Sequence, residues 1–301
     1  MTPEGATIDC PSCGQRVVAT EVADIPSTDT SDRFTIGRCT RCGLLRTIPA
    51  PADLSPYYAT DLAETMTRSG SRVFSALRKL QLGRELARVT AHGDPGTVLD
   101  VGCGTGDFAL VIRGRGLPVI AADTAPERPA LLAGRTEIPY VRFDFETHEF
   151  LGLDIRGPYT VILRHVLEHV RDPGAFLASL RALGAQQFYI VVPNAASIER
   201  RLLGRYWYLW DPPRHLWHFA AASLDRVCRR AGLVTLRQGR GTAPTLVPSV
   251  YRYLRLHGWS ASAYERFAPN RLLSALSAPL NMLLPGNVLW LFARATGSGS
   301  V

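Results

Sequence analysis

Four cysteines near the start of the chain form two pairs of the same design. Cys10, Cys13, Cys39 and Cys42 form two Cys-X-X-Cys pairs, and a glycine follows each pair. Two thiolates at this spacing can grip one side of a tetrahedral ion, and the glycine permits the tight turn that follows. Four sulfurs complete the shell of a structural Zn²⁺ and leave no position for a reacting water. The sequence predicts a small zinc ribbon over residues 1–48, with a β-hairpin between the two pairs.

A glycine-rich turn forms the second group of residues that can do chemistry. The apolar run Thr97–Val101, which contains Asp100, leads directly into Gly102, Cys103, Gly104 and Gly106. Alternate glycines let the backbone turn sharply and approach a ligand closely. The run before the turn reads as a buried strand and residues 107–115 read as a helix, which is the context of a nucleotide-binding turn.

Carboxylates indicate the charge of the expected ligand. Asp100 would favour the sulfonium and ammonium of S-adenosylmethionine and repel the pyrophosphate of a dinucleotide. At the end of the next expected strand, Asp123 can accept hydrogen bonds from ribose hydroxyls. Asp144 can accept from the adenine amino group while Phe145 covers the ring. The alternative is that Asp123 and Asp144 only cap a helix or a turn.

A third group follows the apolar strand 161–163. Arg164 and His165 come at its carboxyl end, where the cofactor crevice is expected. Because histidine as a residue type titrates near neutrality, His169 is the first candidate for a general base, with Glu168 orienting it. Alternatively, Glu168 and His169 contribute to a divalent-metal site such as Mg²⁺, or they cap the helix that follows.

An aromatic-rich segment over residues 206–219 carries two further histidines. His215 is a second candidate for the base, while aromatic side chains would exclude water and line an acceptor pocket. The predicted acceptor-binding residues are Tyr58, Tyr206, Trp207, Trp210, Arg214 and His218. The alternative is an aromatic mini-core that only fixes the loop.

These groups need a parallel sheet to bring them together. Strands are expected at 97–101, 118–122, 140–143, 161–163, 187–192, 232–236 and 288–292, and an amphipathic lead-in helix at 73–89. Residues 46–62 carry three prolines and read as a linker. The expected organisation is a zinc ribbon (1–48), a linker with the lead-in helix (49–92), and an α/β domain (93–301) with insertions at about 195–220 and 242–286.

Three motifs resemble those of class I S-adenosylmethionine-dependent methyltransferases. Val98–Gly106 resembles their first motif and Tyr159–Pro173 their fourth, although the acid that normally opens the fourth is missing. Asp211–Phe219 is similar to a signature of the bacterial subgroup that acts on small molecules. The resemblance covers residues 94–294 and implies a Rossmann-like seven-stranded sheet with helices on both faces. In some members a zinc ribbon precedes this domain.

Composition and charge narrow the partners. The net charge of +8 comes almost entirely from arginine, since Lys79 is the single lysine, and the arginines are scattered. A basic balance favours anionic partners, but scattered charges do not make a nucleic-acid surface. No basic run followed by an apolar stretch opens the chain, so a cytoplasmic location is expected. The sequence leaves the oligomeric state open.

An uncharged stretch near the carboxyl terminus raises the question of membrane contact. Residues 272–293 lack charge but are interrupted by prolines, a glycine and asparagines, which favours a helix, a turn and a final buried strand. The helix could also rest on the inner membrane face, helped by basic residues. Those basic residues are Arg252, Arg255, Arg266 and Arg271.

Together these patterns predict methyl transfer to a small-molecule acceptor. The preferred hypothesis is O-methylation of a glycosyl unit or natural-product intermediate, with nitrogen or carbon as other acceptor atoms and a lipid-linked acceptor as a variant. One alternative is a ribosomal-RNA base methyltransferase, because some of those also carry a zinc ribbon. The other is a non-catalytic cofactor-binding scaffold whose ribbon recruits a protein.

Overall fold

A computed structural model describes residues 9–15, 17–27, 30–58, 72–151, 158–258 and 284–296. The chain divides into two compact units. The ribbon unit comprises Met1–Ser69, Pro193–Arg226 and Arg240–Leu289, and the sheet unit comprises Gly70–Val192, Val227–Gly239 and Trp290–Val301. The predicted ribbon (1–48) is therefore grouped with both segments expected as insertions, 195–220 and 242–286.

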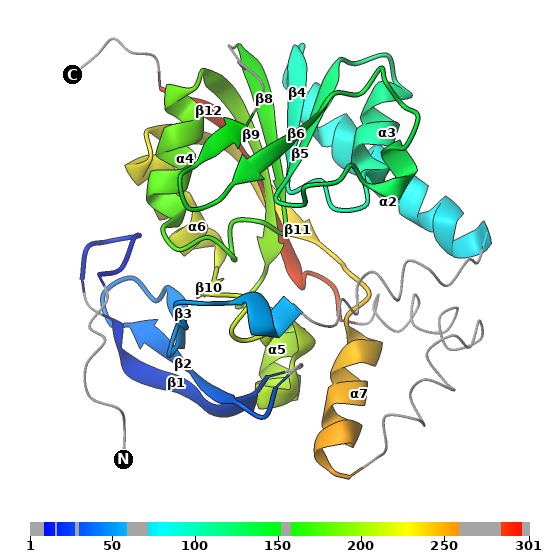
Figure 1. Cartoon of the computed structure of the whole chain (residues 1–301). Helices are drawn as coiled ribbons and strands as arrows, with labels where there is room; N and C mark the ends of the chain where they lie inside the picture. Colours follow the sequence, from blue (N-terminus) through cyan, green and yellow to red (C-terminus); the bar gives the residue numbers. More distant parts are fainter. Residues whose placement is uncertain are drawn as a thin grey trace. The chain divides into compact units, whose positions relative to one another are not determined.

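The sheet unit is built on one mixed sheet in the order β11-β12-β9-β8-β4-β5-β6-β7 (Figure 1). Strands β9, β8, β4, β5 and β6 pair in parallel with their neighbours in that order, and β7 pairs antiparallel with β6. The strands are β4 (Thr97–Val101), β5 (Val119–Asp123), β6 (Tyr140–Asp144), β7 (Glu149–Leu151), β8 (Tyr159–Arg164), β9 (Ala185–Pro193), β11 (Leu233–Gly241) and β12 (Val288–Ala295).

The predicted Rossmann-like α/β sheet is confirmed. All seven expected strands form, and the last lies between β9 and β11. β7 is an eighth strand beyond the seven that the sequence predicts. The central strands read as continuous apolar runs because helices cover both faces: Val161, Ile162 and Leu163 of β8 are fully buried.

Helices flank this sheet on both faces, with α2 and α3 on one face and α4 on the other (Figure 1). The helices are α2 (Arg72–Thr90), α3 (Asp107–Arg113) and α4 (Pro173–Ala182). Asp172 caps α4, since its carboxylate accepts from the amides of Gly174 and Ala175, both at 2.9 Å. The lead-in helix predicted at 73–89 is thus confirmed as α2.

The ribbon unit contains a four-stranded sheet in the order β1-β2-β3-β10. Its strands are β1 (Val17–Pro26), β2 (Arg33–Cys39), β3 (Leu45–Ile48) and β10 (Trp217–His218). The hairpin expected between the cysteine pairs is confirmed as β1 and β2. The predicted linker over 46–62 is wrong at its start, because residues 45–48 pair with both β2 and β10. The prolines that suggested a linker begin only after this strand ends.

Helices complete the ribbon unit: η1 (Ser55–Tyr58), α5 (Ile198–Leu203), η3 (Gly204–Tyr206), η4 (Tyr208–Trp210) and α7 (Leu246–Leu256). Helix α6 (Ala221–Arg230) spans the boundary between the two units.

A buried carboxylate, that of Glu199, connects three segments of the ribbon unit. Glu199 accepts from the Thr245 hydroxyl at 2.7 Å and from the Asn287 amide at 2.6 Å. Burial raises the pKa of Glu199, against these hydrogen bonds.

The structure describes part of the carboxyl-terminal region in which a helix and a final strand were predicted. The helix expected from Leu272 lies outside the described residues, whereas the final strand is confirmed as β12. Arg252, predicted to assist membrane contact, is 8% exposed and donates to the carbonyls of Pro26, Trp207 and Tyr208. Its charge is therefore used inside the ribbon unit. No helix among the described residues has the length and apolar character needed to cross a membrane.

Candidate functional site

The glycine turn follows β4, the strand that pairs with both β5 and β8. Gly102, Gly104 and Gly106 have φ of 72°, 53° and 81°, a region that other residues adopt only with strain. A Cβ on Gly102 would lie 2.4 Å from Val166, and one on Gly106 would lie 2.5 Å from Leu132. At Gly104, by contrast, a Cβ would meet no atom of the described residues within 4 Å. The turn is packed at both ends and open in its middle.

Two carboxylates accompany the turn, and their environments differ. Asp100 is 2% exposed, and its Oδ2 has no hydrogen-bond partner among the described residues. Burial, opposed by the Arg164 charge, raises the pKa of Asp100 to about 7. Asp123 uses Oδ2 to accept from the Gly104 amide at 2.7 Å and Oδ1 to accept from the Thr124 amide at 2.7 Å. The second acid therefore holds the open glycine in place.

Two other predicted cofactor residues of this region have protein partners. The Arg164 guanidinium donates to Glu85 at 2.8 Å and lies 4.8 Å from the centre of the Phe108 ring. Any role in cofactor binding would thus be through its charge near Asp100. Cys103 is 7% exposed, and burial raises the pKa of its thiol, so it is not an activated nucleophile.

Asp144 caps a turn. Its Oδ1 accepts from the amides of Glu146 at 2.7 Å and Thr147 at 3.1 Å, and these bonds lower its pKa. The Phe145 ring packs edge-on against Phe143, with centroids 4.9 Å apart. This is the alternative interpretation of Asp144 from the sequence, and contact with an adenine remains a prediction for both residues.

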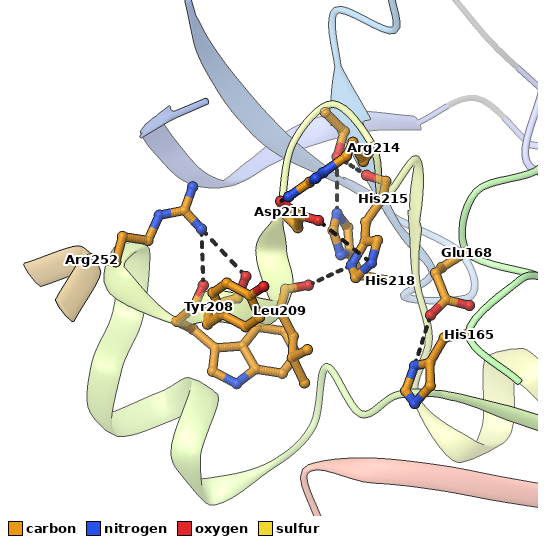
Figure 2. Close-up of polar contacts among 11 residues, drawn as sticks. His165, Glu168, Tyr208, Leu209, Asp211, Arg214, His215, His218 and Arg252 are labelled. Carbon is orange, nitrogen blue, oxygen red and sulfur yellow. Dashed lines mark hydrogen bonds and ion pairs between the residues drawn. The ribbon is translucent and has the colours of Figure 1, made fainter. Parts of the chain in front are cut away.

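His165, Glu168 and His169 follow β8 within a short turn. His165 has φ of 56°, and its side chain is 38% exposed. Its Nδ1 lies 3.2 Å from Oε1 of Glu168, a carboxylate with no exposed surface (Figure 2). The His169 amide donates to the Val166 carbonyl at 2.9 Å, and a ligand atom of His169 lies within 4.8 Å of one of Glu168. Glu168 is therefore placed to orient the imidazole of His165, whereas its predicted role in orienting His169 stays a prediction.

In the ribbon unit, the four cysteines meet as predicted. Their Sγ atoms all lie within 4.8 Å of one another, with Cys10–Cys42 and Cys13–Cys39 separations of 3.4 Å. Both knuckles turn alike, because Gly14 and Gly43 each have φ of 73°. Amides of the two glycines donate back to the first cysteine carbonyl of each pair, at 2.7 Å and 2.9 Å. Four free thiols in this arrangement could hold a structural tetrahedral ion.

The segment 208–219, here called the histidine loop, carries the second group of predicted site residues. His215 is 6% exposed, and its Nδ1 lies 2.9 Å from the Leu209 carbonyl (Figure 2). Arg214 donates to Asp211 Oδ1 at 2.7 Å, while Asp211 Oδ2 lies 4.0 Å from His215 Nε2. Burial raises the pKa of Asp211, but the charges of Arg214 and His215 outweigh it and lower the pKa overall.

The predicted acceptor-binding aromatics are distributed differently. Trp207 and Trp210 have no exposed surface and belong to a core cluster with Ile25, Ile36 and Leu45. This cluster is the aromatic mini-core that the sequence allowed as an alternative. The packing favours a core role for the two tryptophans over a role in lining a pocket. Tyr206 instead packs against the half-exposed Tyr253 of α7, with centroids 5.0 Å apart. The Tyr58 side chain lies outside the described residues.

Three residues with clear roles at these sites were not singled out from the sequence. Glu85 of α2 pairs with Arg164, Asp211 faces both Arg214 and His215, and Thr47 of β3 contacts the histidine loop. Asp211 stands in the quoted Asp211–Phe219 motif, which is a usable signal. Glu85 and Thr47 have no local signal, since their partners are 79 and 168 residues away.

A family model described as a methyltransferase domain matches residues 74–238, more than half of the chain. Curated relatives from Cereibacter sphaeroides, called ubiquinone biosynthesis O-methyltransferase, are 30% identical over 146 residues. That match covers 45% of this chain and 59% of the relative, so the chain spans only part of the relatives' length.

Solved structures with a similar fold include two methyltransferases. The 1,6-didemethyltoxoflavin-N1-methyltransferase of Burkholderia thailandensis is 18% identical with a TM-score of 0.48, covering 86% of this chain and 97% of its own. A SAM-dependent methyltransferase from Archaeoglobus fulgidus is 17% identical with a TM-score of 0.49, covering 78% and 100%. Similarity at this level carries no conclusion about substrate.

The family assignment rests on the match to residues 74–238, which begins in α2 and ends in β11 and so includes the glycine turn and the Arg164–His169 segment. The chain belongs to the methyltransferase-domain family, as its first and fourth motifs predict.

Proposed function

We propose that the chain is an S-adenosylmethionine-dependent methyltransferase acting on a small molecule. The observation that carries this proposal is the glycine turn, which is open at Gly104 and has the buried Asp100 carboxylate at its base. A buried carboxylate oxygen without a partner suits a cationic ligand and disfavours a pyrophosphate. The bound cofactor would supply a methyl group already activated by its sulfonium.

The residues of the sheet unit fit this group through charge and backbone shape. Asp100 would face the positive charge, and Gly104 would let the backbone approach the ligand because its Cβ position is open. Asp123 holds the Gly104 amide and retains lone pairs that can accept from hydroxyls. Arg164, which also pairs with Glu85, would limit the cost of burying the Asp100 charge.

The acceptor is proposed to be a hydroxyl of a small metabolite. Curated relatives are named for O-methylation in ubiquinone biosynthesis, which supports oxygen as the acceptor atom. A glycosyl unit or a lipid-linked intermediate would present the same O–H group. A hydroxyl must lose its proton on methylation, and His169 or His215 would serve as the base. Glu168 would orient an imidazole in the sheet unit, and Asp211 lies 4.0 Å from Nε2 of His215 in the ribbon unit.

The four cysteines are proposed to hold a structural Zn²⁺. The donor set is four thiols within 4.8 Å, which fits a closed tetrahedral shell. Such an ion would supply folding energy to the ribbon unit and take no part in the transfer itself.

The proposed activity can be tested with cofactor labelled in the methyl group. Purified full-length protein would be incubated with this cofactor and fractionated extracts of small molecules, lipids and RNA. We expect label in a small organic or lipid fraction, with mass analysis locating it on oxygen. Label found only in RNA would contradict the small-molecule acceptor. Absence of label from every fraction, together with undiminished cofactor binding, would favour the scaffold alternative.

Two glycine variants test whether the turn cradles the cofactor. Gly104→Ala and Gly116→Ala both place an alanine at positive φ, 53° and 79°, with no described atom within 4 Å of the new Cβ. Each should therefore cost a similar amount of stability, about 1 kcal/mol. Only Gly104→Ala adds a methyl group to the ligand-facing turn. Calorimetry should show cofactor affinity reduced at least tenfold by Gly104→Ala and unchanged by Gly116→Ala. Equal affinities in both variants would contradict the proposed binding mode.

The titration of Asp100 predicts a pH dependence of stability. Its pKa is about 7 in the folded chain, above its ordinary value of 3.8, so Asp100 keeps its proton to a higher pH in the folded chain than in the unfolded chain. Stability therefore falls as pH rises from about 4 to about 7. Asp100→Asn removes this pH dependence. Urea unfolding should show that the free energy of unfolding of the variant, relative to that of the wild type, increases by on the order of 2–3 kcal/mol from pH 5 to pH 8. A difference that does not change with pH would contradict the burial argument.

Metal analysis tests the cysteine site. We expect close to one zinc per chain in the purified protein, and loss of most of it in Cys39→Ser, with a lowered melting temperature. Cys228→Ser is the matched control, because Cys228 is equally buried but stands outside the four-cysteine cluster. That control should retain its zinc. Full zinc content in Cys39→Ser would show that the cluster is not the metal site.

A further inference from the structure

The strand that leaves the second cysteine pair is also the partner of the histidine loop. β3 begins at Leu45, and its antiparallel partner β10 aligns Trp217 with Arg46 and His218 with Leu45. In addition, the Thr47 amide donates to the Leu216 carbonyl at 3.0 Å. The cysteine module and the histidine loop are therefore parts of one sheet within the ribbon unit.

The Thr47 hydroxyl decides which nitrogen of His218 carries the proton. It lies 2.6 Å from the His215 carbonyl and 3.0 Å from His218 Nε2, and Thr47 is fully buried. A carbonyl oxygen can only accept, so the single hydroxyl proton of Thr47 is donated to His215. The contact with His218 then requires Nε2–H to donate to the Thr47 oxygen.

Burial leaves His218 neutral with one proton. The residue is 1% exposed, and burial, reinforced by the nearby His215, holds its pKa well below the ordinary value. With the proton on Nε2, the lone pair is on Nδ1, an atom without a hydrogen-bond partner among the described residues. The Trp210 ring packs edge-on against the imidazole at 4.8 Å and restricts its rotation.

Thr47 also fixes the backbone of His215, because its hydroxyl donates to the His215 carbonyl. The position of the proton on the neutral His215 ring is set by a different contact, with Leu209. Nδ1 of His215 donates to the Leu209 carbonyl at 2.9 Å, so the neutral ring carries its lone pair on Nε2. Asp211 Oδ2 lies 4.0 Å from that Nε2. The ring of His215 is thus held by the histidine loop itself, through Leu209, and its backbone carbonyl is held by Thr47 of β3.

We propose that Thr47 is a positioning residue that sets the proton location on His218 and holds the backbone of His215. The cysteine module would then be a structural part of the loop that carries a candidate base, and not a separate recruiting module. The significance for catalysis rests on the proposed methyl transfer, but the proton positions themselves do not depend on it.

The test uses the full-length protein without substrate. Nitrogen-15 spectra of the histidine side chains distinguish protonated from unprotonated ring nitrogens. We expect His218 to be protonated on Nε2 alone in the wild type, and Thr47→Ser to preserve this. Thr47→Val keeps the shape but removes the hydroxyl, so His218 should lose its single proton position and the His215 ring signals should move.

Two results would overturn the proposal. One is an unchanged pair of ring states in a folded Thr47→Val variant. The other is a wild-type His218 protonated on Nδ1, and this measurement decides even where Thr47→Val does not fold. Calorimetry with S-adenosylmethionine on the same samples keeps the two proposals apart: a protein that binds no cofactor but shows the expected ring states loses the proposed function and retains this inference.

Discussion

A carboxylate buried beneath a left-handed glycine turn is the constraint on which the rest of this chain depends. Ionising a group that is 2% exposed is costly, and the pKa of Asp100 is accordingly raised to about 7. The charge of Arg164 supplies partial compensation, and the nearby carboxylate of Glu85 opposes it. A protein that keeps such a group at the end of its central strand retains it at a cost in stability, and a positively charged ligand would repay that cost.

The ribbon unit solves a different problem, which is how to hold polar and titratable groups in a fixed geometry inside a small core. The histidine loop is anchored by its own contacts, such as His215 with Leu209, and by the hydroxyl of Thr47 on β3. A sheet of four strands, two of them very short, buries little apolar surface by itself. A metal ion bound by the cysteines would stabilise the strands that carry these anchors.

Local patterns predicted most of the fold. The strand before the glycine turn, the helix after it and the lead-in helix α2 were each recognisable in short windows of sequence. Each of these elements has its apolar residues at the spacing that packing in the core of one sheet requires. The cysteine cluster was predictable because ligand spacing is a local property. The same holds for Asp123, which stands at a strand end as expected.

What could not be predicted depends on contacts between distant segments. Nothing near Thr47 or Glu85 in sequence indicates His215 or Arg164. β3 was hidden because the prolines that follow it suggest a linker, and β10 is only two residues long. Trp207 and Trp210 have the composition of either a pocket wall or a core, and only packing places them in the core.

Calorimetric titration of the full-length protein at pH 6.5, in two buffers of different ionisation enthalpy, tests the central claim most directly. The account predicts saturable binding of S-adenosylmethionine with release of a proton, because the bound cation stabilises the ionised form of Asp100. It also predicts no binding of a nicotinamide dinucleotide. Tight binding of the dinucleotide with no heat from S-adenosylmethionine would contradict it.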